Sequence, residues 1–183
     1  MVISNDTIQY ILGRSSIRAY QNKPLNKERI DLLKKSVLAA PTARNRQQLR
    51  YAFVTDQGII EQIDERIFHY CDPEMKTIME ERNSSSFFYG APLCVLITGK
   101  DTLWIDIDAG IAIQTLAIAA QSLGLSSVIL GMPRLAFKKD DPKNCRALLE
   151  IGEDEKFCIA IAIGYADMTK APHPHNHSLI SDY

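Results

Sequence analysis

Apolar residues recur at helical spacing twice near the start of the chain, from Ile8 to Leu12 and from Ile30 to Ala40. Asn26 precedes the second run and is a good helix cap. Pro41 interrupts that run, because proline has no N–H to continue the helical hydrogen bonds. The pattern predicts two amphipathic helices on either side of a basic loop.

The following segments alternate between helical and strand character. A helical face extends from Ile59 to Ile67, and a short helix is predicted to start at Asp72. β-Branched and aromatic residues mark four predicted strands, and the last three are apolar enough to be central strands of one sheet. The four are Tyr51–Thr55, Leu93–Thr98, Ser126–Leu130 and Phe157–Gly164.

The least ambiguous helix of the chain runs from about Ile105 to Leu123. It is apolar on almost every face, and Gly124 follows it as a natural C-terminal cap. Because so apolar a helix is stable only when it is covered, we expect it at the centre of the molecule or at an interface between subunits.

Composition restricts the class of protein. The chain has 183 residues, 46% of them hydrophobic, so we expect one packed domain over residues 1–183. Lys plus Arg number 21 against 22 Asp plus Glu, a balance that does not favour a nucleic-acid partner. Four scattered cysteines, no leader-like start and no run as long as a membrane span predict an unprocessed cytoplasmic protein without a membrane partner.

Several catalytic and metal-binding motifs are missing from the sequence. There is no Gly-x-Ser-x-Gly elbow, no phosphate-binding Gly-rich loop after a strand, no His-Glu-x-x-His helix and no pair of cysteines at zinc spacing. His173, His175 and His177 alternate near the C-terminus and could chelate a metal. Pro172 and Pro174 keep that segment extended, and no carboxylate or Cys stands beside it. We therefore expect a solvated tail or a partner contact there, and no metal site.

Two polar clusters remain as candidates for chemistry, Arg14–Arg18 and Pro41–Gln47. The two arginines of the first could simply complement the C-terminal end of the preceding helix, and the second could be a capped surface loop. Alternatively, two guanidinium groups and a serine hydroxyl form a fork suited to a phosphate. Asn45 and Gln47 offer the donors and acceptors that the edge of a flavin ring requires.

Four stretches of the chain, in this order, resemble the FMN-dependent nitroreductases. Residues 14–18 (RSSIR) are similar to that family's Arg-Arg-Ser-x-Arg opening, and residues 39–48 (AAPTARNRQQ) resemble its Ala-Pro-Ser-x-x-Asn-x-Gln-Pro-Trp signature. Residues 88–92 (FYGAP) lead into a strand as the family's Ala-Pro does. Residues 108–125, followed by a strand and Gly131, are similar to its long central helix and Gly-Leu-Gly turn. With Ile163–Ala166 (IGYA), the resemblance covers nearly the whole chain.

The resemblance implies an α+β fold with a mixed, mainly antiparallel sheet covered by helices, and an intertwined homodimer with the long helix near its centre. It also implies FMN as the cofactor and NADH or NADPH as the electron donor. Arg14, Ser15, Ser16 and Arg18 are then expected at the phosphate and ring of FMN, and Asn45 and Gln47 at the ring edge. Pro41 and Thr42 are expected to reach in from the partner subunit.

Leu130 and Gly131 are expected beneath the flavin N5, where the backbone N–H of Gly131 would donate a hydrogen bond and no side-chain acid or base is needed. The sequence departs from the family pattern at Gln48–Leu49, which stand where the family has Pro-Trp. Where the family places a basic residue against the phosphate, this chain offers Lys170, followed by histidines. Because fewer permanent charges would then hold the phosphate, we expect weaker FMN binding than is usual in the family.

The segment Pro73–Tyr89 occupies the region that forms the acceptor lid in relatives. Phe87 and Phe88 in it are predicted to stack on a planar substrate, with a hydrophobic contact to the dimer partner as the alternative. The predicted function is a ping-pong NAD(P)H oxidoreductase acting on a nitroaromatic or a quinone. The alternatives are a flavin-binding sensor or storage protein, and a specialised flavin-fragmenting or dehalogenating member of the superfamily.

Overall fold

The computed structural model describes residues 5–183 of the chain. Its α-helices are α1 (Asp6–Gly13), α2 (Lys27–Leu38), α3 (Gln57–Tyr70), α4 (Pro73–Glu81) and α5 (Ile105–Ser122). The strands are β1 (Leu49–Val54), β2 (Leu93–Lys100), β3 (Ser126–Leu130) and β4 (Glu155–Gly164). Short 3₁₀ helices are η1 (Ala43–Asn45), η2 (Met132–Phe137), η3 (Ala147–Leu149) and η4 (His177–Leu179).

One four-stranded sheet in the order β1-β2-β4-β3 forms the centre of the fold, and each neighbouring pair is antiparallel. A parallel pairing occurs at the isolated bridge between Ser16 and Ser127. The α+β class predicted from the sequence is thus confirmed, with the sheet antiparallel throughout its four strands.

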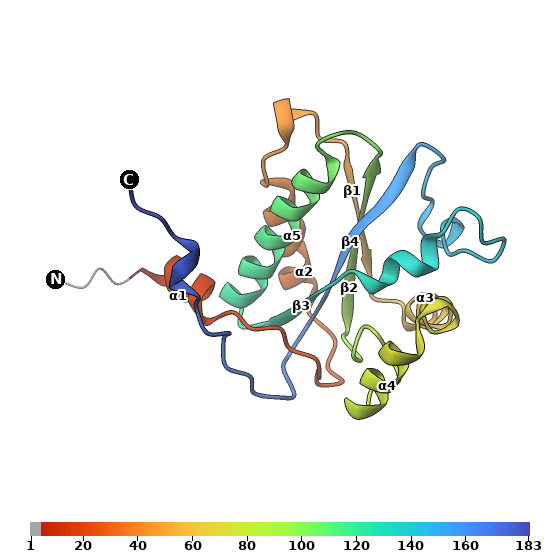
Figure 1. The fold of residues 1–183 in the computed structure, drawn as a ribbon, viewed down its shortest axis with the longest axis horizontal. Coiled ribbons are helices and arrows are strands. Elements are labelled where there is room, and N and C mark those ends of the chain that lie inside the picture. The colour runs from red at the N-terminus through yellow and green to blue at the C-terminus, as the bar shows by residue number, and fades with distance from the viewer. Residues whose placement is uncertain (1–4) are drawn as a thin grey trace.

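Helices cover both faces of the sheet (Figure 1). Odd-numbered residues of β2 and of β4 from Ile159 onward, such as Val95 and Ile161, face α2 and α5, whereas even-numbered residues such as Leu96 and Ala162 pack with α3 and η2. Because side chains alternate across a strand, the continuous apolar runs of β2 and β4 serve two cores at once. These two strands are central, as predicted.

The prediction of a central position was wrong for β3, which lies at the edge of the sheet. Its free side is partly covered by the segment after α1, where Ile17 N donates to Ser127 O at 3.1 Å. Val128 and Leu130 are also buried from the side of α3 and η2. Coverage on both faces and along one edge gives an edge strand the apolar pattern of a central one.

The ends of the predicted helices follow their capping residues. The side chain of Asn26 accepts from Arg29 N, and that of Asp72 accepts from Met75 N. Gly124 has φ +71° after α5, and Leu125 N donates to Ala120 O at 2.9 Å. This six-residue closure requires a left-handed residue, so the glycine fixes the sharp exit from α5 into β3.

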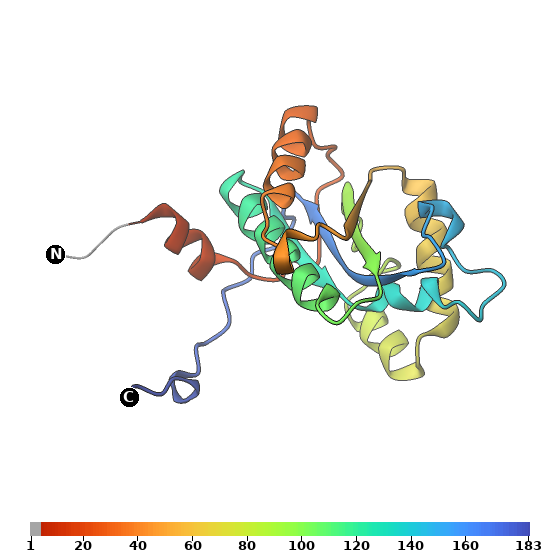
Figure 2. The same cartoon turned by 90° about the horizontal axis from the view of Figure 1, so that it is seen from above.

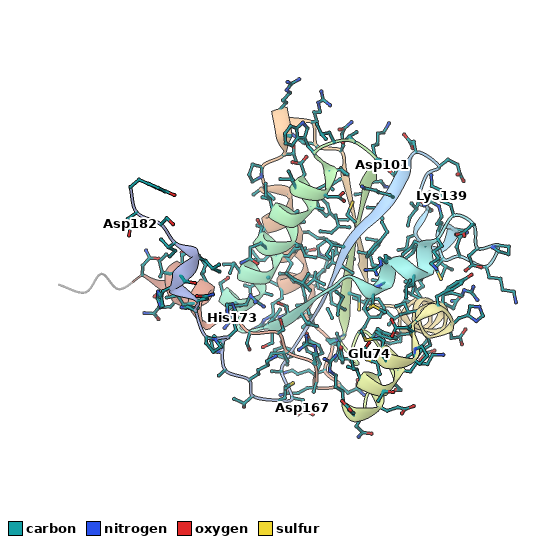
Figure 3. The ribbon with its side chains drawn as sticks, in the orientation of Figure 1. Glu74, Asp101, Lys139, Asp167, His173 and Asp182 are labelled. Atoms are coloured by element: carbon teal, nitrogen blue, oxygen red, sulfur yellow. The ribbon has the colours of Figure 1, made fainter. Side chains whose placement is uncertain are left out.

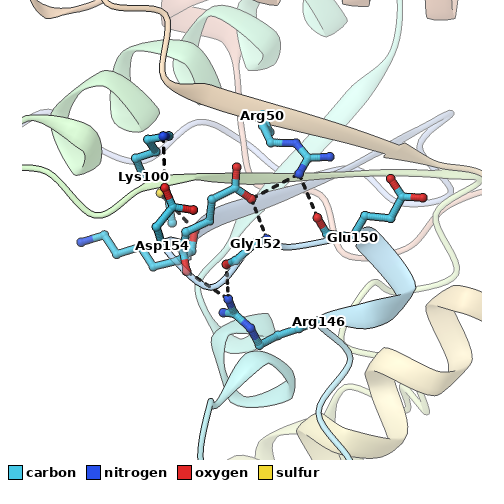
Figure 4. A network of polar contacts seen from close by, with 9 residues as sticks. Arg50, Lys100, Arg146, Glu150, Gly152 and Asp154 are labelled. Carbon is cyan, nitrogen blue, oxygen red and sulfur yellow. Dashed lines mark hydrogen bonds and ion pairs between the residues drawn. The ribbon is translucent and has the colours of Figure 1, made fainter.

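A polar network ties β1 and β2 to the turn before β4 (Figure 4). Arg50 donates to the carbonyl of Glu150 at 2.8 Å and pairs with Glu155 at 3.3 Å. Arg146, which is buried, donates to the carbonyls of Gly152 and Glu155. Each buried charge here has a hydrogen-bond partner, so the network connects the sheet to this turn and offers no unpaired buried charge to a ligand.

Helix α1 and the C-terminal tail extend away from the sheet on the same side of the molecule (Figures 1 and 2). None of the residues of α1 is buried, although the helix contacts α5. Among residues 5–183 no helix is both long and apolar enough to cross a membrane.

Candidate functional site

The basic segment Arg14–Arg18 lies along β3 and beside the chain that follows β4. Ser15 Oγ donates to the carbonyl of Lys170 at 2.8 Å, a contact between residues 155 positions apart. Arg18 N contacts Met168 Sδ at 3.3 Å. The fold therefore brings the backbone of Lys170 to Ser15, in the same segment as Arg14 and Arg18, as the family resemblance had implied.

The cationic groups of this cluster have no anionic partner among residues 5–183. None of Arg14, Arg18 and Lys170 forms an ion pair there. Arg18 Nε is buried and has no hydrogen-bond partner. A buried polar atom without a partner destabilises the fold by on the order of 1–3 kcal/mol, so this atom calls for an acceptor that the described chain does not supply.

Tyr20 fixes the backbone that carries these groups. Its hydroxyl lies 2.9 Å from the carbonyl oxygen of Ile17 and 3.2 Å from that of Ala162. Burial, partly offset by the charge of Arg18, raises the pKa of Tyr20 far above its usual range. The phenol therefore stays protonated and keeps donating to the basic segment at every physiological pH.

The second cluster forms a tight loop, Pro41–Gln47, hereafter the 41–47 loop. Ala43 N donates to Asp108 Oδ1 at 2.9 Å, and Gln47 N donates to Thr42 Oγ1 at 3.1 Å. Arg44, Asn45 and Gln47 all have positive φ, near +50°. Left-handed non-glycine residues are unfavourable, so the hydrogen bonds to Asp108 and Thr42 offset local strain.

The amides of Asn45 and Gln47 pair with each other at the surface. Gln47 Nε2 donates to Asn45 Oδ1 at 2.8 Å, and both residues are exposed. This pairing leaves the amino group of Asn45 as a donor and the carbonyl oxygen of Gln47 as an acceptor on the exposed surface of the loop. Such an edge is complementary to an imide or amide edge of a flat ring.

Within one chain the two clusters lie at opposite ends of α5 (Figure 1). Asp108, in the first turn of α5, binds the 41–47 loop, whereas the basic segment meets Ser127, just beyond the last turn. At 1.5 Å per residue, Asp108 and Leu123 are about 22 Å apart along the axis. The two clusters of one chain cannot surround the same ring.

Leu130 and Gly131 end β3 on the side away from Ser127. Leu130 is buried and Gly131 is exposed, and the ladder with β4 ends at the pair Leu130–Ala160. Gly131 N therefore lies past the last registered pair of the sheet. Four residues of strand separate it from Ser127, which corresponds to about 13 Å.

Phe87 and Phe88 do not have the position predicted for substrate-stacking residues. They are 2% and 0% exposed, and they belong to the core around α3 and α4. Asp64 on α3 draws them inward, since it accepts from Phe87 N at 2.8 Å and from Ser86 Oγ at 2.5 Å. The aromatic run was wrongly interpreted as a substrate surface because the buried carboxylate that anchors it lies twenty-three residues earlier.

The three tail histidines are exposed, and their rings meet edge to face at 5.7 Å and 6.4 Å between successive centroids. His173 and Asp182 mark this tail, which runs clear of the sheet (Figure 3). Within residues 5–183, no group of three or more His, Cys, Asp or Glu side chains has a geometry that could hold a metal ion.

Asp108 was not singled out from the sequence, although it positions the 41–47 loop. It is only 5% exposed, on a helix whose other buried residues are all apolar. A lone acid among the inward-facing positions of an apolar helix is the signal that could have found it, because a buried carboxylate needs donors.

Comparison with known proteins agrees with this arrangement. The sequence profile described as the nitroreductase family matches residues 11–165, which include the basic segment, the 41–47 loop and Gly131. The chain belongs to the nitroreductase family. The crystal structure of a nitroreductase with bound FMN from Desulfitobacterium hafniense has a TM-score of 0.92 at 26% identity, covering 99% of this chain and 100% of that one.

Two further nitroreductase-family comparisons extend this match. A nitroreductase with bound FMN from Bacteroides fragilis has a TM-score of 0.83 at 25% identity, covering 98% of this chain and 100% of that one. The FMN reductase (NAD(P)H) of Bacillus subtilis is 27% identical over 161 residues, or 80% of this chain and 60% of that protein. The chain therefore spans less than two thirds of that relative.

Proposed function

We propose that this nitroreductase-family chain is an FMN-dependent NAD(P)H oxidoreductase that reduces a small planar acceptor, such as a nitroaromatic or a quinone. The observation that carries the proposal is the unpartnered cationic cluster of Arg14, Arg18 and Lys170 next to Ser15. The likeness to two FMN-bound nitroreductases over almost their whole length supports the choice of cofactor.

The residues present fit the phosphate of FMN. Arg18 Nε is buried without an acceptor, and the cationic groups of Arg14 and Lys170 have no carboxylate partner among residues 5–183. Guanidinium groups bind a phosphate by paired charged hydrogen bonds. Ser16 is half-buried in the same segment, so its backbone and hydroxyl complete the phosphate and ribityl side of the site.

FMN, when bound, supplies the chemistry: it accepts a hydride from NAD(P)H and passes it on to the acceptor. The chain contributes binding and orientation. Leu130 provides an apolar surface and Gly131 a backbone N–H that lies outside the sheet ladder, a donor of the kind that stabilises developing negative charge. Asn45 and Gln47 present their donor–acceptor edge to the ring, next to Pro41 and Thr42. This division of roles requires no side-chain acid or base.

We place the 41–47 loop of one subunit at the basic segment of a second copy. The two clusters lie at opposite ends of α5, so an antiparallel pairing of α5 with the same helix of a partner brings them together. Ile107 and Ile111, one turn apart on α5, are 55% and 39% exposed. Further exposed apolar residues lie on α1, which contacts α5, and on the tail: Ile8, Ile11, Leu12, Leu179 and Ile180. Apolar exposure on this scale is typical of an interface.

A reducing, cytoplasmic setting belongs to the same proposal. All four cysteines are free thiols, and Cys71, Cys94 and Cys145 are buried in the core. Buried free thiols are typical of proteins that are not exposed to an oxidising compartment.

The first test is the visible spectrum of the purified protein, before and after anaerobic addition of NADH or NADPH. Oxidised-flavin bands that bleach rapidly on addition are the expected result, and the faster donor is then the preferred one. A bound flavin that no donor bleaches would favour a sensor or storage protein. A protein that stays colourless after reconstitution with FMN would refute the cofactor assignment.

Two further measurements test the site and the kinetic scheme. Arg18→Ala should lower FMN affinity by about 1.5–3 kcal/mol, the range for a charged hydrogen bond. Unchanged flavin occupancy would contradict the phosphate assignment. Initial rates at varied donor and acceptor should give parallel double-reciprocal lines, since both reactants use one pocket in turn. Intersecting lines would exclude the ping-pong scheme.

A further inference from the structure

The 41–47 loop carries two arginines that the proposed function leaves without a role. Arg44 and Arg46 flank Asn45, at positions that are unspecified in the signature which this loop resembles. Both side chains are exposed. Neither forms a hydrogen bond or an ion pair through its guanidinium group with any residue of the described chain.

Carboxylates at this end of the sheet have partners other than these arginines. Lys156 lies between Asp106 and Asp101, at 2.9 Å and 3.1 Å, and Asp154 pairs with Lys100 at 3.1 Å. Asp108 is buried and accepts from the backbone of the loop. The two guanidinium groups are therefore available to an external anion.

The loop is held in place from inside, so its arginines start from fixed backbone positions. Ala43 N is bound by Asp108, and the hydroxyl of Thr42 closes the loop on Gln47 N. Arg44 itself has φ 53° and ψ 27°, a conformation that an arginine adopts only when its surroundings impose it. Preorganisation of this kind lowers the entropy that is lost when a ligand binds.

We propose that Arg44 and Arg46 form an anion subsite that makes the enzyme prefer reactants carrying a phosphate or carboxylate group. This proposal rests on the proposed function, which places the 41–47 loop at the ring edge of the partner's cofactor. Two guanidinium groups next to the amide pair of Asn45 and Gln47 lie where the outer part of a reactant extends past the ring. A planar guanidinium binds carboxylate and phosphate oxygens alike, so donor and acceptor are both candidates.

The experiment compares reactants that differ by one anionic group. NADPH carries a 2′-phosphate that NADH lacks, and 4-nitrobenzoate carries a carboxylate where 4-nitrobenzyl alcohol has a hydroxymethyl group. For each pair, the ratio of kcat/KM between the member with the extra anionic group and the member without it is measured in the wild type, Arg44→Gln, Arg46→Gln and the double variant. Effects common to both members cancel in this ratio. Lys143→Gln is the control, because it removes an exposed charge from the distant loop after η2.

A binding measurement keeps the test independent of turnover. Calorimetry on the oxidised protein, without any electron donor, gives the dissociation constants of 4-nitrobenzoate and 4-nitrobenzyl alcohol. Since the arginines are exposed, we expect the charged-to-neutral preference to fall roughly fivefold in each single variant and tenfold or more in the double variant. The preference should also weaken as salt is raised.

The outcomes separate this inference from the proposed function. A fall in the NADPH/NADH ratio alone assigns the subsite to the donor, and a fall in the nitrobenzoate preference alone assigns it to the acceptor. Ratios and binding preferences that are unchanged in the double variant, or that fall equally in Lys143→Gln, would overturn the inference. A wild type that no donor reduces would refute the proposed function, whereas the calorimetric comparison would still decide the anion subsite.

Discussion

Asp64 is a buried carboxylate whose charge should make the stability of the protein depend on pH. It lies on α3, is 7% exposed, and accepts hydrogen bonds from Ser86 Oγ and Phe87 N. Burial raises the pKa of Asp64 from 3.8 to about 6, although these two hydrogen bonds lower it. A rise of about two pH units is equivalent to about 3 kcal/mol between the two protonation states.

The sign of the effect follows from proton binding. Between pH 3.8 and about 6 the native protein holds a proton at Asp64 that the unfolded chain has released. The free energy of unfolding therefore falls as pH rises through this window, and the full loss of about 3 kcal/mol is reached above pH 6. Asp64→Asn removes this loss, because an amide carbonyl still accepts from Phe87 N but carries no charge.

Urea unfolding followed by circular dichroism, at pH 4 and pH 7.5 with saturating FMN, measures the effect. We expect the stability of Asp64→Asn relative to the wild type to be higher at pH 7.5 than at pH 4 by about 2 kcal/mol, because part of the full effect is already lost at pH 4. Glu65→Gln, an exposed change on the same helix, is the control and should show little pH dependence. A difference between Asp64→Asn and wild type that is the same at both pH values would refute the reasoning.

Three further substitutions test the support of the site and its interface. Asp108→Ala removes the acceptor of Ala43 N, so it should lower stability by about 1–3 kcal/mol and weaken FMN binding in a flavin titration. The control, Asp106→Ala, loses only the ion pair with Lys156 and should retain FMN. Gly124→Ala, at φ +71°, should lower stability by about 1 kcal/mol in thermal unfolding. If the proposed dimer forms through α5, Ile111→Glu should convert it to monomers in light scattering and reduce flavin content; a dimer that persists in this variant would contradict the α5 interface.

Local patterns in the sequence predict most of the secondary structure. The predicted strand Ser126–Leu130 is β3 without adjustment, and the apolar helix begins at Ile105 as α5 does. Both are bounded by residues with a strong backbone preference, such as Gly124, or by a change in hydrophobic period. These signals depend only on near neighbours, which is why they can be read along the chain.

Features that depend on distant contacts could not be predicted in the same way. The left-handed backbone of Arg44 contradicts the local preference of that residue and is imposed in part by Asp108, more than sixty positions later. The burial of Phe88 depends on the placement of its loop by Asp64. At both places tertiary contacts determine the structure, and neither contact is reflected in the hydrophobic periodicity of the nearby sequence.

The strip of chain that carries Arg14 and Arg18 also covers the outer edge of β3. An uncovered strand edge is a template to which other chains can add. A protein without this strip would therefore lose protection against self-association as well as the proposed phosphate ligands. One residue more or less before Ser16 would change the face to which every later side chain of the strip points, because side chains alternate along an extended chain. The number of residues between α1 and Tyr20 therefore matters in two ways. It determines how well the strip covers the edge of β3, and it determines the direction in which the arginine side chains point. An insertion or deletion there should disturb both.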